Sequence, residues 1–154
     1  MEMHSYVTGL VDGEGCFCVS FSKRRKIITG LEVRPSFSVS QHERNKGIIL
    51  YLETFFKCGE VRFSKSDSNW KYEVRSLDDL LNIIIPHFDA YPLQTSKAED
   101  FSKFRKICLL MKQNQHKSLV GLEKIIQLTK NMNAAGKRLY SLATLLSMLD
   151  KMKV

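Results

Sequence analysis

The sequence lacks an apolar run near the roughly 18 residues that a membrane span needs, and it has no signal-peptide pattern. We therefore expect a soluble chain that does not enter a membrane and is not secreted. Its four cysteines form no CxxC pair and its four histidines have no metal-ligand spacing, so a zinc site is not expected and buried free thiols are. No linker or low-complexity segment divides the chain, which predicts one domain over residues 1–154.

Acidic residues are in the minority, and this imbalance indicates the kind of partner. The chain has 16 Asp and Glu against 24 Lys and Arg, a formal net charge of +8. Such a surplus favours an anionic partner such as nucleic acid, although charge alone does not separate DNA from RNA or an acidic membrane. With 44% apolar residues, the chain can still build a core of ordinary size.

Hydrophobic spacing predicts an α+β fold with the order αββαββα and two further C-terminal helices. The first helix, over residues 6–13, is expected to begin at Ser5 and to end at Gly15. A helix starting at residue 79 is expected to end before Pro86. The remaining elements are strands at 16–22, 31–40, 61–64 and 70–75, and helices at 45–57, 96–111, 118–130 and 137–152.

One face of the predicted strands is polar, and its basic residues are concentrated on the strands and at the hairpin tips. A solvated sheet face would also alternate in this way. A β-ribbon, however, fits the DNA major groove, where Lys and Arg contact phosphate and guanine and short polar groups contact base edges. The predicted DNA-binding residues are Ser20, Ser22, Lys23, Arg24, Arg25, Lys26, Glu32, Arg34, Ser36, Ser38, Ser40, Arg62, Ser64, Lys71, Glu73 and Arg75.

The stretch YVTGLVDGEGCF at residues 6–17 contains two glycines at helical spacing, although glycine costs a helix about 1 kcal/mol relative to alanine. Gly9 and Gly13 are four residues apart and share one helix face, which lets another backbone approach closely. That backbone can belong to the chain's own sheet or to a second helix. Because Val7, Leu10 and Val11 already supply an apolar stripe, the glycine face is predicted to meet a second helix.

The same stretch contains two acids, Asp12 and Glu14, which are two residues apart and cannot share a helix face. One can be structural while the other extends beyond the C-terminal end of the helix. The helix dipole repels a carboxylate there unless a cation lies beside it. A hard divalent ion and a neighbouring Lys or Arg are both candidates for that cation.

The segment VTGLVDGEG at residues 7–15 resembles the motif of the LAGLIDADG homing endonucleases, with Glu14 at the position of the metal-binding acid. FSVSQ at 37–41 and YPLQTSK at 91–97 extend the resemblance over essentially the whole chain. It implies that two motif helices pack together and that sheets form a saddle on the DNA major groove. Because the chain has one motif, the resemblance implies a homodimer. The predicted dimer interface consists of Val7, Gly9, Leu10, Asp12 and Gly13.

The resemblance also implies roles for catalytic residues. Glu14, with the carbonyl of Gly13, would hold Mg²⁺ or another divalent metal such as Mn²⁺. Gln41 would position the attacking water, and Lys97 would polarise the site. Lys97 is also a cation in the first turn of a predicted helix, where the dipole disfavours it. Related enzymes often carry an arginine four residues after the glutamine, where this chain has Asn45, so Arg44 or Lys46 is left as a substitute.

These features together predict a site-specific endonuclease that binds double-stranded DNA and makes a metal-dependent double-strand break at a long pseudo-palindromic site. An RNA maturase, for which RNA would be the partner, and a non-catalytic DNA-binding protein are alternatives on the same scaffold. Glu14, Gln41 and Lys97 together favour the nuclease over both. Family members of this length are typically intron-encoded in organelles, so a mitochondrial or chloroplast location is expected.

Overall fold

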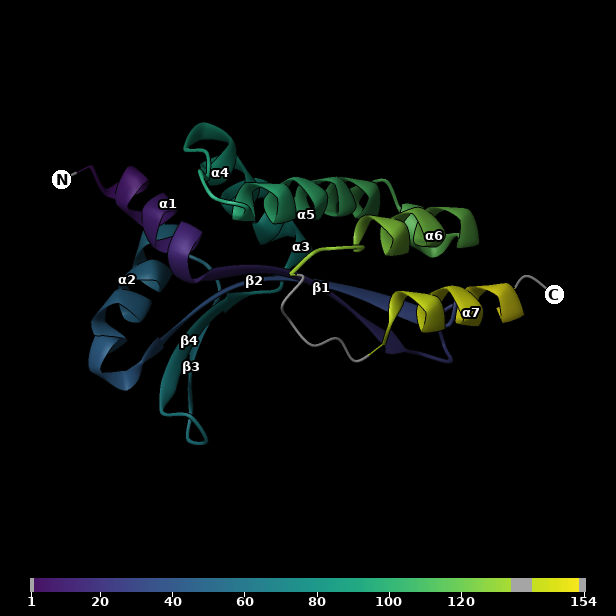
Figure 1. The fold of residues 1–154 in the computed structure, drawn as a ribbon, viewed down its shortest axis with the longest axis horizontal. Coiled ribbons are helices and arrows are strands. Elements are labelled where there is room, and N and C mark those ends of the chain that lie inside the picture. Colours follow the sequence, from purple (N-terminus) through teal and green to yellow (C-terminus); the bar gives the residue numbers. More distant parts are fainter. Residues whose placement is uncertain (1, 134–139, 153–154) are drawn as a thin grey trace. The chain divides into compact units, whose positions relative to one another are not determined.

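The computed structural model describes residues 2–133 and 140–152, and its α+β fold confirms the predicted class (Figure 1). Helix α1 leads directly into strand β1 and the hairpin that β1 forms with β2. The next helix, α2, is followed by a second hairpin, and the described residues after that hairpin form helices and no further strand. The elements are α1 (Met3–Glu14), β1 (Gly15–Lys23), β2 (Leu31–His42), α2 (Lys46–Phe56), β3 (Glu60–Ser64), β4 (Asn69–Val74), α3 (Leu77–Asp79), α4 (Ile85–Ala90), α5 (Lys97–Lys112), α6 (Leu119–Leu128) and α7 (Leu142–Met152).

The four strands form one antiparallel sheet in the order β1-β2-β4-β3. Phe37, Val39 and Gln41 of β2 pair with Val74, Tyr72 and Trp70 of β4, while Arg62 of β3 pairs with Lys71 of β4. Burial alternates along β1 and β2, which confirms the prediction of one apolar and one polar face. The chain divides into two compact units. The prediction of one domain over residues 1–154 stays a prediction.

The first unit comprises Met1–Phe17 and Ser36–Ala98. Its core is an aromatic cluster in which the rings of Phe17, Phe37 and Phe88 lie 5.2 to 5.7 Å from one another. All three side chains are at most 1% exposed. Burying side chains of this size is the main stabilising contribution that holds α1, the sheet and α4 together in this unit.

His87 of α4 is buried beside this aromatic cluster. Its Nε2 lies 3.2 Å from the hydroxyl of Thr8, and the same hydroxyl donates to the carbonyl of Tyr91 at 3.0 Å. Burial, with a smaller contribution from the neighbouring His4, lowers the pKa of His87 from 6.5 to about 4. His87 is therefore neutral at neutral pH and packs as an aromatic side chain.

The second unit comprises Cys18–Pro35 and Glu99–Val154. Its described helices bury the apolar stripes that the sequence predicted, including Phe104, Ile107 and Cys108 of α5 and Leu145 and Leu149 of α7. None of the four cysteines, all of them in the described residues, forms a disulfide, as predicted, but only Cys108 is buried and the predicted burial is wrong for the other three, which are half-buried. The predicted helix at 137–152 begins at Leu142 in the described part of the chain, and residues 137–139 lie outside it.

Two predicted helix boundaries are wrong. Glu2, not Ser5, caps α1, because its carboxylate accepts hydrogen bonds from the backbone N–H groups of His4 and Ser5 at 3.0 and 2.7 Å. The helix near residue 79 does not end before Pro86. A π-helical stretch over Leu80–Ile84 shifts the hydrogen-bond register, and Pro86 then lies in the first turn of α4, where its missing N–H is not needed.

No helix in residues 2–133 or 140–152 is long and apolar enough to cross a membrane.

Candidate active site and nucleic-acid interface

The C-terminal end of α1 is held by Gly15, which confirms the predicted end of this helix. Its backbone N–H donates to the carbonyl of Val11, and its extended conformation starts β1 without a loop. A Cβ at this position would lie 2.5 Å from Val11 Cγ1 and 2.8 Å from the Val11 carbonyl oxygen, so only glycine fits. Glu14 is therefore fixed at the junction of helix and strand, where its side chain is exposed.

Asp12 has a structural role. The sequence analysis had left open whether Asp12 or Glu14 would be the structural acid. Its carboxylate accepts the backbone N–H of Gln94 at 2.9 Å, the backbone N–H of Thr95 at 3.1 Å and the Thr95 hydroxyl at 2.8 Å. Burial raises the pKa of Asp12, but these hydrogen bonds and the charge of Lys97 outweigh it, so the pKa lies below its ordinary value of 3.8. Asp12 thus ties the end of α1 to the segment before α5.

Lys97, the first residue of α5, adds two further contacts to these segments. We call the contacts among Asp12, Thr95, Lys97 and the carbonyl of Gly15 the clasp between α1 and α5. Its backbone N–H donates to the Thr95 hydroxyl at 3.2 Å, and its ammonium group donates to the carbonyl of Gly15. The cation therefore lies beside Gly15, the residue that follows Glu14, although Lys97 and Gly15 are 82 positions apart in the chain. Among the ion pairs of the described residues none uses the Glu14 carboxylate. Lys97 binds a backbone carbonyl at the negative end of α1, which compensates the helix dipole.

Thr95 is the residue of this arrangement that the sequence analysis did not single out. Its hydroxyl donates to Asp12 and accepts from the backbone of Lys97, so it transmits the position of one helix end to the other. The only signal for it in the sequence was its place within YPLQTSK at residues 91–97. A short polar side chain in such a segment is common in any loop, so the spacing alone could not identify its partner.

Gln41 lies near the end of β2, and its side-chain oxygen accepts a hydrogen bond from Asn45 at 3.0 Å. Trp70 is the cross-strand neighbour of Gln41, and the ammonium group of Lys46 lies 4.3 Å from the ring centroid of Trp70. Of the two basic residues left as substitutes for the missing arginine, Lys46 is therefore held next to the pair formed by Gln41 and Trp70.

The oxygen atoms at the end of α1 suit a hard divalent cation, which prefers carboxylate, carbonyl and water ligands. In the described part of the chain, no three His, Cys, Asp or Glu side chains gather closely enough to hold a metal. The exposed carboxylate of Glu14 and the neighbouring backbone carbonyls are oxygen donors of the type that such a cation prefers.

Gly9 and Gly13 form an open strip on α1. Both are exposed, and a Cβ added to either would meet no atom within 4 Å. Leu10 is half-buried, whereas Val7, which the sequence analysis placed in the dimer interface, is 0% exposed. Val7 is buried together with Thr8 and Val11 in the core of its own unit, so the exposed part of the predicted interface is the strip at Gly9 and Gly13 with the half-buried Leu10. Asp12 is engaged with Gln94 and Thr95 instead of facing outward.

The polar sheet face of the first unit is strongly basic, but two of its predicted DNA contacts, Ser38 and Glu73, are buried in the single chain. Glu73 and Ser38 pair across β4 and β2 and are each only 8% exposed. The carboxylate of Glu73 is occupied by three basic side chains, so it is no free acceptor for a base edge. The other predicted contacts in this unit are exposed or half-buried: Ser36, Ser40, Arg62, Ser64, Lys71 and Arg75.

The second unit contributes the β1–β2 hairpin. The turn is closed by a hydrogen bond from the backbone N–H of Arg24 to the carbonyl of Gly30, and Arg24 forms an ion pair with Glu32 at 2.9 Å. The predicted contacts of this unit are all exposed or half-buried: Ser20, Ser22, Lys23, Arg24, Arg25, Lys26, Glu32 and Arg34.

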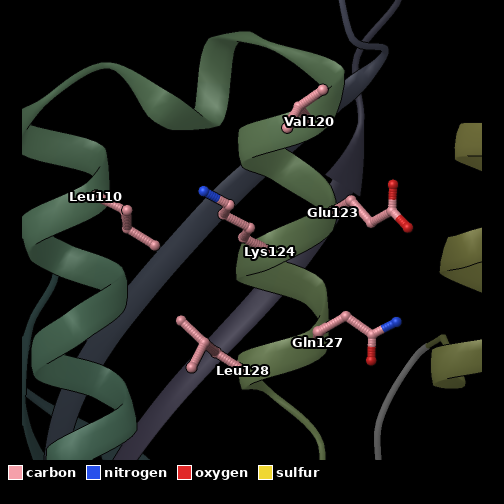
Figure 2. A pocket seen from close by; sticks show the side chains of 6 residues that line it. All are labelled: Leu110, Val120, Glu123, Lys124, Gln127 and Leu128. Carbon is pink, nitrogen blue, oxygen red and sulfur yellow. The ribbon is translucent and has the colours of Figure 1, made fainter.

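A cavity of about 550 Å³ lies between α5 and α6 in the second unit (Figure 2). Leu110 and Leu128 face each other across it, Lys124 extends into the same space, and Val120, Glu123 and Gln127 complete its lining. The cavity contains none of the predicted site residues.

Comparison with known proteins identifies the family. A family model described as LAGLIDADG endonuclease matches residues 7–108. The probable intron-encoded endonuclease 2 of Neurospora crassa is 32% identical over 130 residues, which are 84% of this chain and 29% of the relative. The crystal structure of the homing endonuclease I-TnaI superposes with a TM-score of 0.84 at 34% identity and 97% coverage of both chains.

A further structure similar to this chain is I-SmaMI bound to cleaved DNA, with a TM-score of 0.86 and 33% identity. The match covers 95% of this chain but 48% of the I-SmaMI chain. The chain therefore spans less than a third of the Neurospora relative and about half of I-SmaMI, and nearly the whole of I-TnaI. The extent of the family match, together with the motif helix and the αββ repeats, establishes that this chain belongs to the LAGLIDADG endonuclease family.

Proposed function

We propose that this chain is a site-specific DNA endonuclease that acts as a homodimer and cuts both strands of a pseudo-palindromic site. The observation that carries the proposal is the clasp between α1 and α5. It brings the ammonium group of Lys97 to the carbonyl of Gly15, directly beside the exposed Glu14, at the end of the helix that bears the family motif. A half-buried carboxylate, Asp12, and an exposed one, Glu14, thus serve structure and chemistry separately.

The side chains at this helix end suit phosphodiester hydrolysis. Glu14 and the carbonyl of Gly13 would hold Mg²⁺ or Mn²⁺, which when bound supplies a nucleophilic water and stabilises charge on the phosphate. Lys97 places a positive charge beside the same helix end, where charge develops on a reacting phosphate. Gln41, oriented by its hydrogen bond with Asn45, would hold a water molecule.

The glycine strip of α1, Gly9 and Gly13, supports the homodimer. Open space at both positions allows a second helix backbone to approach, which would place two copies of Glu14 near one DNA duplex. Two copies of this chain also approach the size of I-SmaMI, of which the chain covers 48%. A two-fold protein predicts two half-sites about 10 bp apart, centre to centre.

DNA as the substrate is supported by the basic sheet face and by the DNA bound in structures of I-SmaMI and I-LtrWI. We further propose that the chain is intron-encoded and organellar, because its relatives in Neurospora crassa are named intron-encoded endonucleases.

A plasmid cleavage assay tests this function. The plasmid carries the DNA that flanks the reading frame, joined as it would be without the insertion, and is incubated with the protein and Mg²⁺ or with EDTA. Linear product that forms only with the metal supports the proposal. Intact plasmid together with tight binding of the host intron RNA would instead support a maturase. Specific DNA binding without cleavage would support a regulator.

A further inference from the structure

The carboxylate of Glu73 forms ion pairs with three basic side chains, and it lies on the face proposed to contact DNA. Its side chain is 9% exposed, while those of Arg62 and Arg75 are 53% and 56% exposed. One carboxylate oxygen, Oε1, accepts a hydrogen bond from Arg62 Nη2 at 2.8 Å and forms an ion pair with Arg75, whose Nε lies 2.8 Å away. The other oxygen, Oε2, lies 3.2 Å from Lys71 Nζ. One buried carboxylate therefore holds three basic side chains.

The strand register explains why this carboxylate is needed. Arg62 and Lys71 are directly opposite each other on β3 and β4, a like-charge pair that destabilises a sheet. Glu73 is two residues along β4 from Lys71 on the same face, so it reaches Lys71, its diagonal neighbour Arg62 and the following Arg75. Without Glu73 the three cations would repel one another and spread into solvent.

Glu73 contacts one nitrogen of each arginine, so other N–H groups of the two guanidinium groups can bind DNA. The ion pair of Arg75 with Glu73 is made at Nε, the guanidinium nitrogen nearest the side-chain stem. Arg62 is held through one Nη atom. A guanidinium group has five N–H donors, and its paired donors match guanine O6 and N7 or a phosphate. Fixing the stem of such a side chain before binding reduces the entropy lost on binding.

We propose that Glu73 is a positioning residue that holds Arg62, Lys71 and Arg75 in a fixed array and thereby sets the sequence specificity of DNA binding. It contacts no base itself. The array has a net charge of +2, one less than its three cations, which limits sequence-independent attraction to phosphates. This inference rests on the proposed function as a DNA endonuclease. In it, Arg62, Lys71 and Arg75 discriminate between DNA sequences, and the buried Glu73 makes that discrimination possible by holding them.

Glu60 provides a matched control. It pairs with Glu73 across β3 and β4 and lines the same cavity of about 350 Å³ beside Arg75, but it is exposed. Glu60→Gln changes the net charge by the same amount as Glu73→Gln without removing the carboxylate that binds the array. Glu73→Asp keeps the charge and shortens the reach, so it separates positioning from charge.

The experiment uses the full chain and a randomised duplex library, from which bound sequences are enriched and read. We expect Glu73→Gln and Glu73→Asp to reduce the discrimination between enriched and random duplexes about tenfold or more, which is the effect of removing one bidentate arginine–base interaction. Glu73→Gln should in addition bind random duplexes at least as tightly as the parent, with a steeper salt dependence. Glu60→Gln should keep the parental discrimination. Melting temperatures show whether each variant is folded.

A proton–nitrogen NMR correlation spectrum of the arginine side chains tests the array without DNA. Resolved Nη–H signals from Arg62, whose rotation is restricted by the hydrogen bond to Glu73, should be present in the parent and absent in Glu73→Gln, and their absence from the parent would overturn the array itself. Parental protein that enriches no sequence would overturn the proposed function and with it the role of Glu73. Parental enrichment that both Glu73 variants retain in full would overturn the positioning role alone.

Discussion

Replacing Asp12 with alanine should destabilise the fold, because the clasp between α1 and α5 depends on its carboxylate. Two backbone N–H groups and one hydroxyl would lose a charged acceptor at 2.8 to 3.1 Å. A hydrogen bond to a charged group contributes about 1.5–3 kcal/mol net, and the site is partly exposed, so water replaces some of it. We expect the free energy of unfolding to fall by about 2–4 kcal/mol for Asp12→Ala. Asp12→Asn, which keeps one acceptor oxygen, should lose about half as much.

The dependence of this loss on pH gives a second test. The folded-state pKa of Asp12 lies below its ordinary value of 3.8, so its stabilising contribution is present above that value and is lost as the pH falls through the lowered pKa. Urea unfolding of parent and variant should therefore differ most near neutral pH and converge in acid. Glu53→Ala, at an exposed position on α2, is the control and should cost about 0.5 kcal/mol or less. A fully stable Asp12→Ala protein, or a loss that does not change with pH, would refute the clasp.

Three further predictions concern other parts of the chain. His87 is neutral in the folded protein and has a pKa of about 4 against an ordinary 6.5, so stability should fall as the pH drops below about 6.5 and be about 2 kcal/mol lower at pH 5; thermal unfolding should show this in the parent and a flatter profile in His87→Gln. Gly9→Leu should leave the chain folded, because nothing lies within 4 Å of the new Cβ, but should abolish the homodimer; a dimer seen by light scattering in this variant would contradict the proposed helix pairing. The double change Arg25→Ala with Lys26→Ala, at the hairpin turn, should weaken binding to all duplexes alike and make the salt slope shallower by about 0.9 for each phosphate that the variant no longer neutralises; unequal weakening between sequences would instead indicate that these side chains touch bases.

The strands, their polar face and the helix ends at glycine followed from the sequence because each depends on local patterns. Alternation fixed which residues of β1 and β2 face the core, and the steric demand at Gly15 is a property of one turn. The π-helical stretch before Pro86 did not follow, because a helix can end before proline or change its hydrogen-bond register, and the choice depends on packing.

The site was less predictable than the fold, since its contacts join residues far apart in the chain. The sequence showed that Asp12 and Glu14 could not share a role, but not which of them was structural. That answer depends on the backbone N–H groups of Gln94 and Thr95. Glu73 was read as a base contact because alternation gives a side chain's face and says nothing about its partners.

The effect of Glu14→Gln on cleavage tests the central claim most directly. Stability without metal should stay equal or rise, because the variant removes a carboxylate from the negative end of α1. Apo DNA binding should persist or tighten, since two carboxylates would no longer face the DNA backbone. Cleavage with Mg²⁺ should fall by several orders of magnitude if Glu14 holds the metal. Melting temperature, DNA affinity in Ca²⁺ and plasmid cleavage in Mg²⁺ are measured on one preparation. A folded, DNA-binding Glu14→Gln protein that cuts near the parental rate would contradict the account.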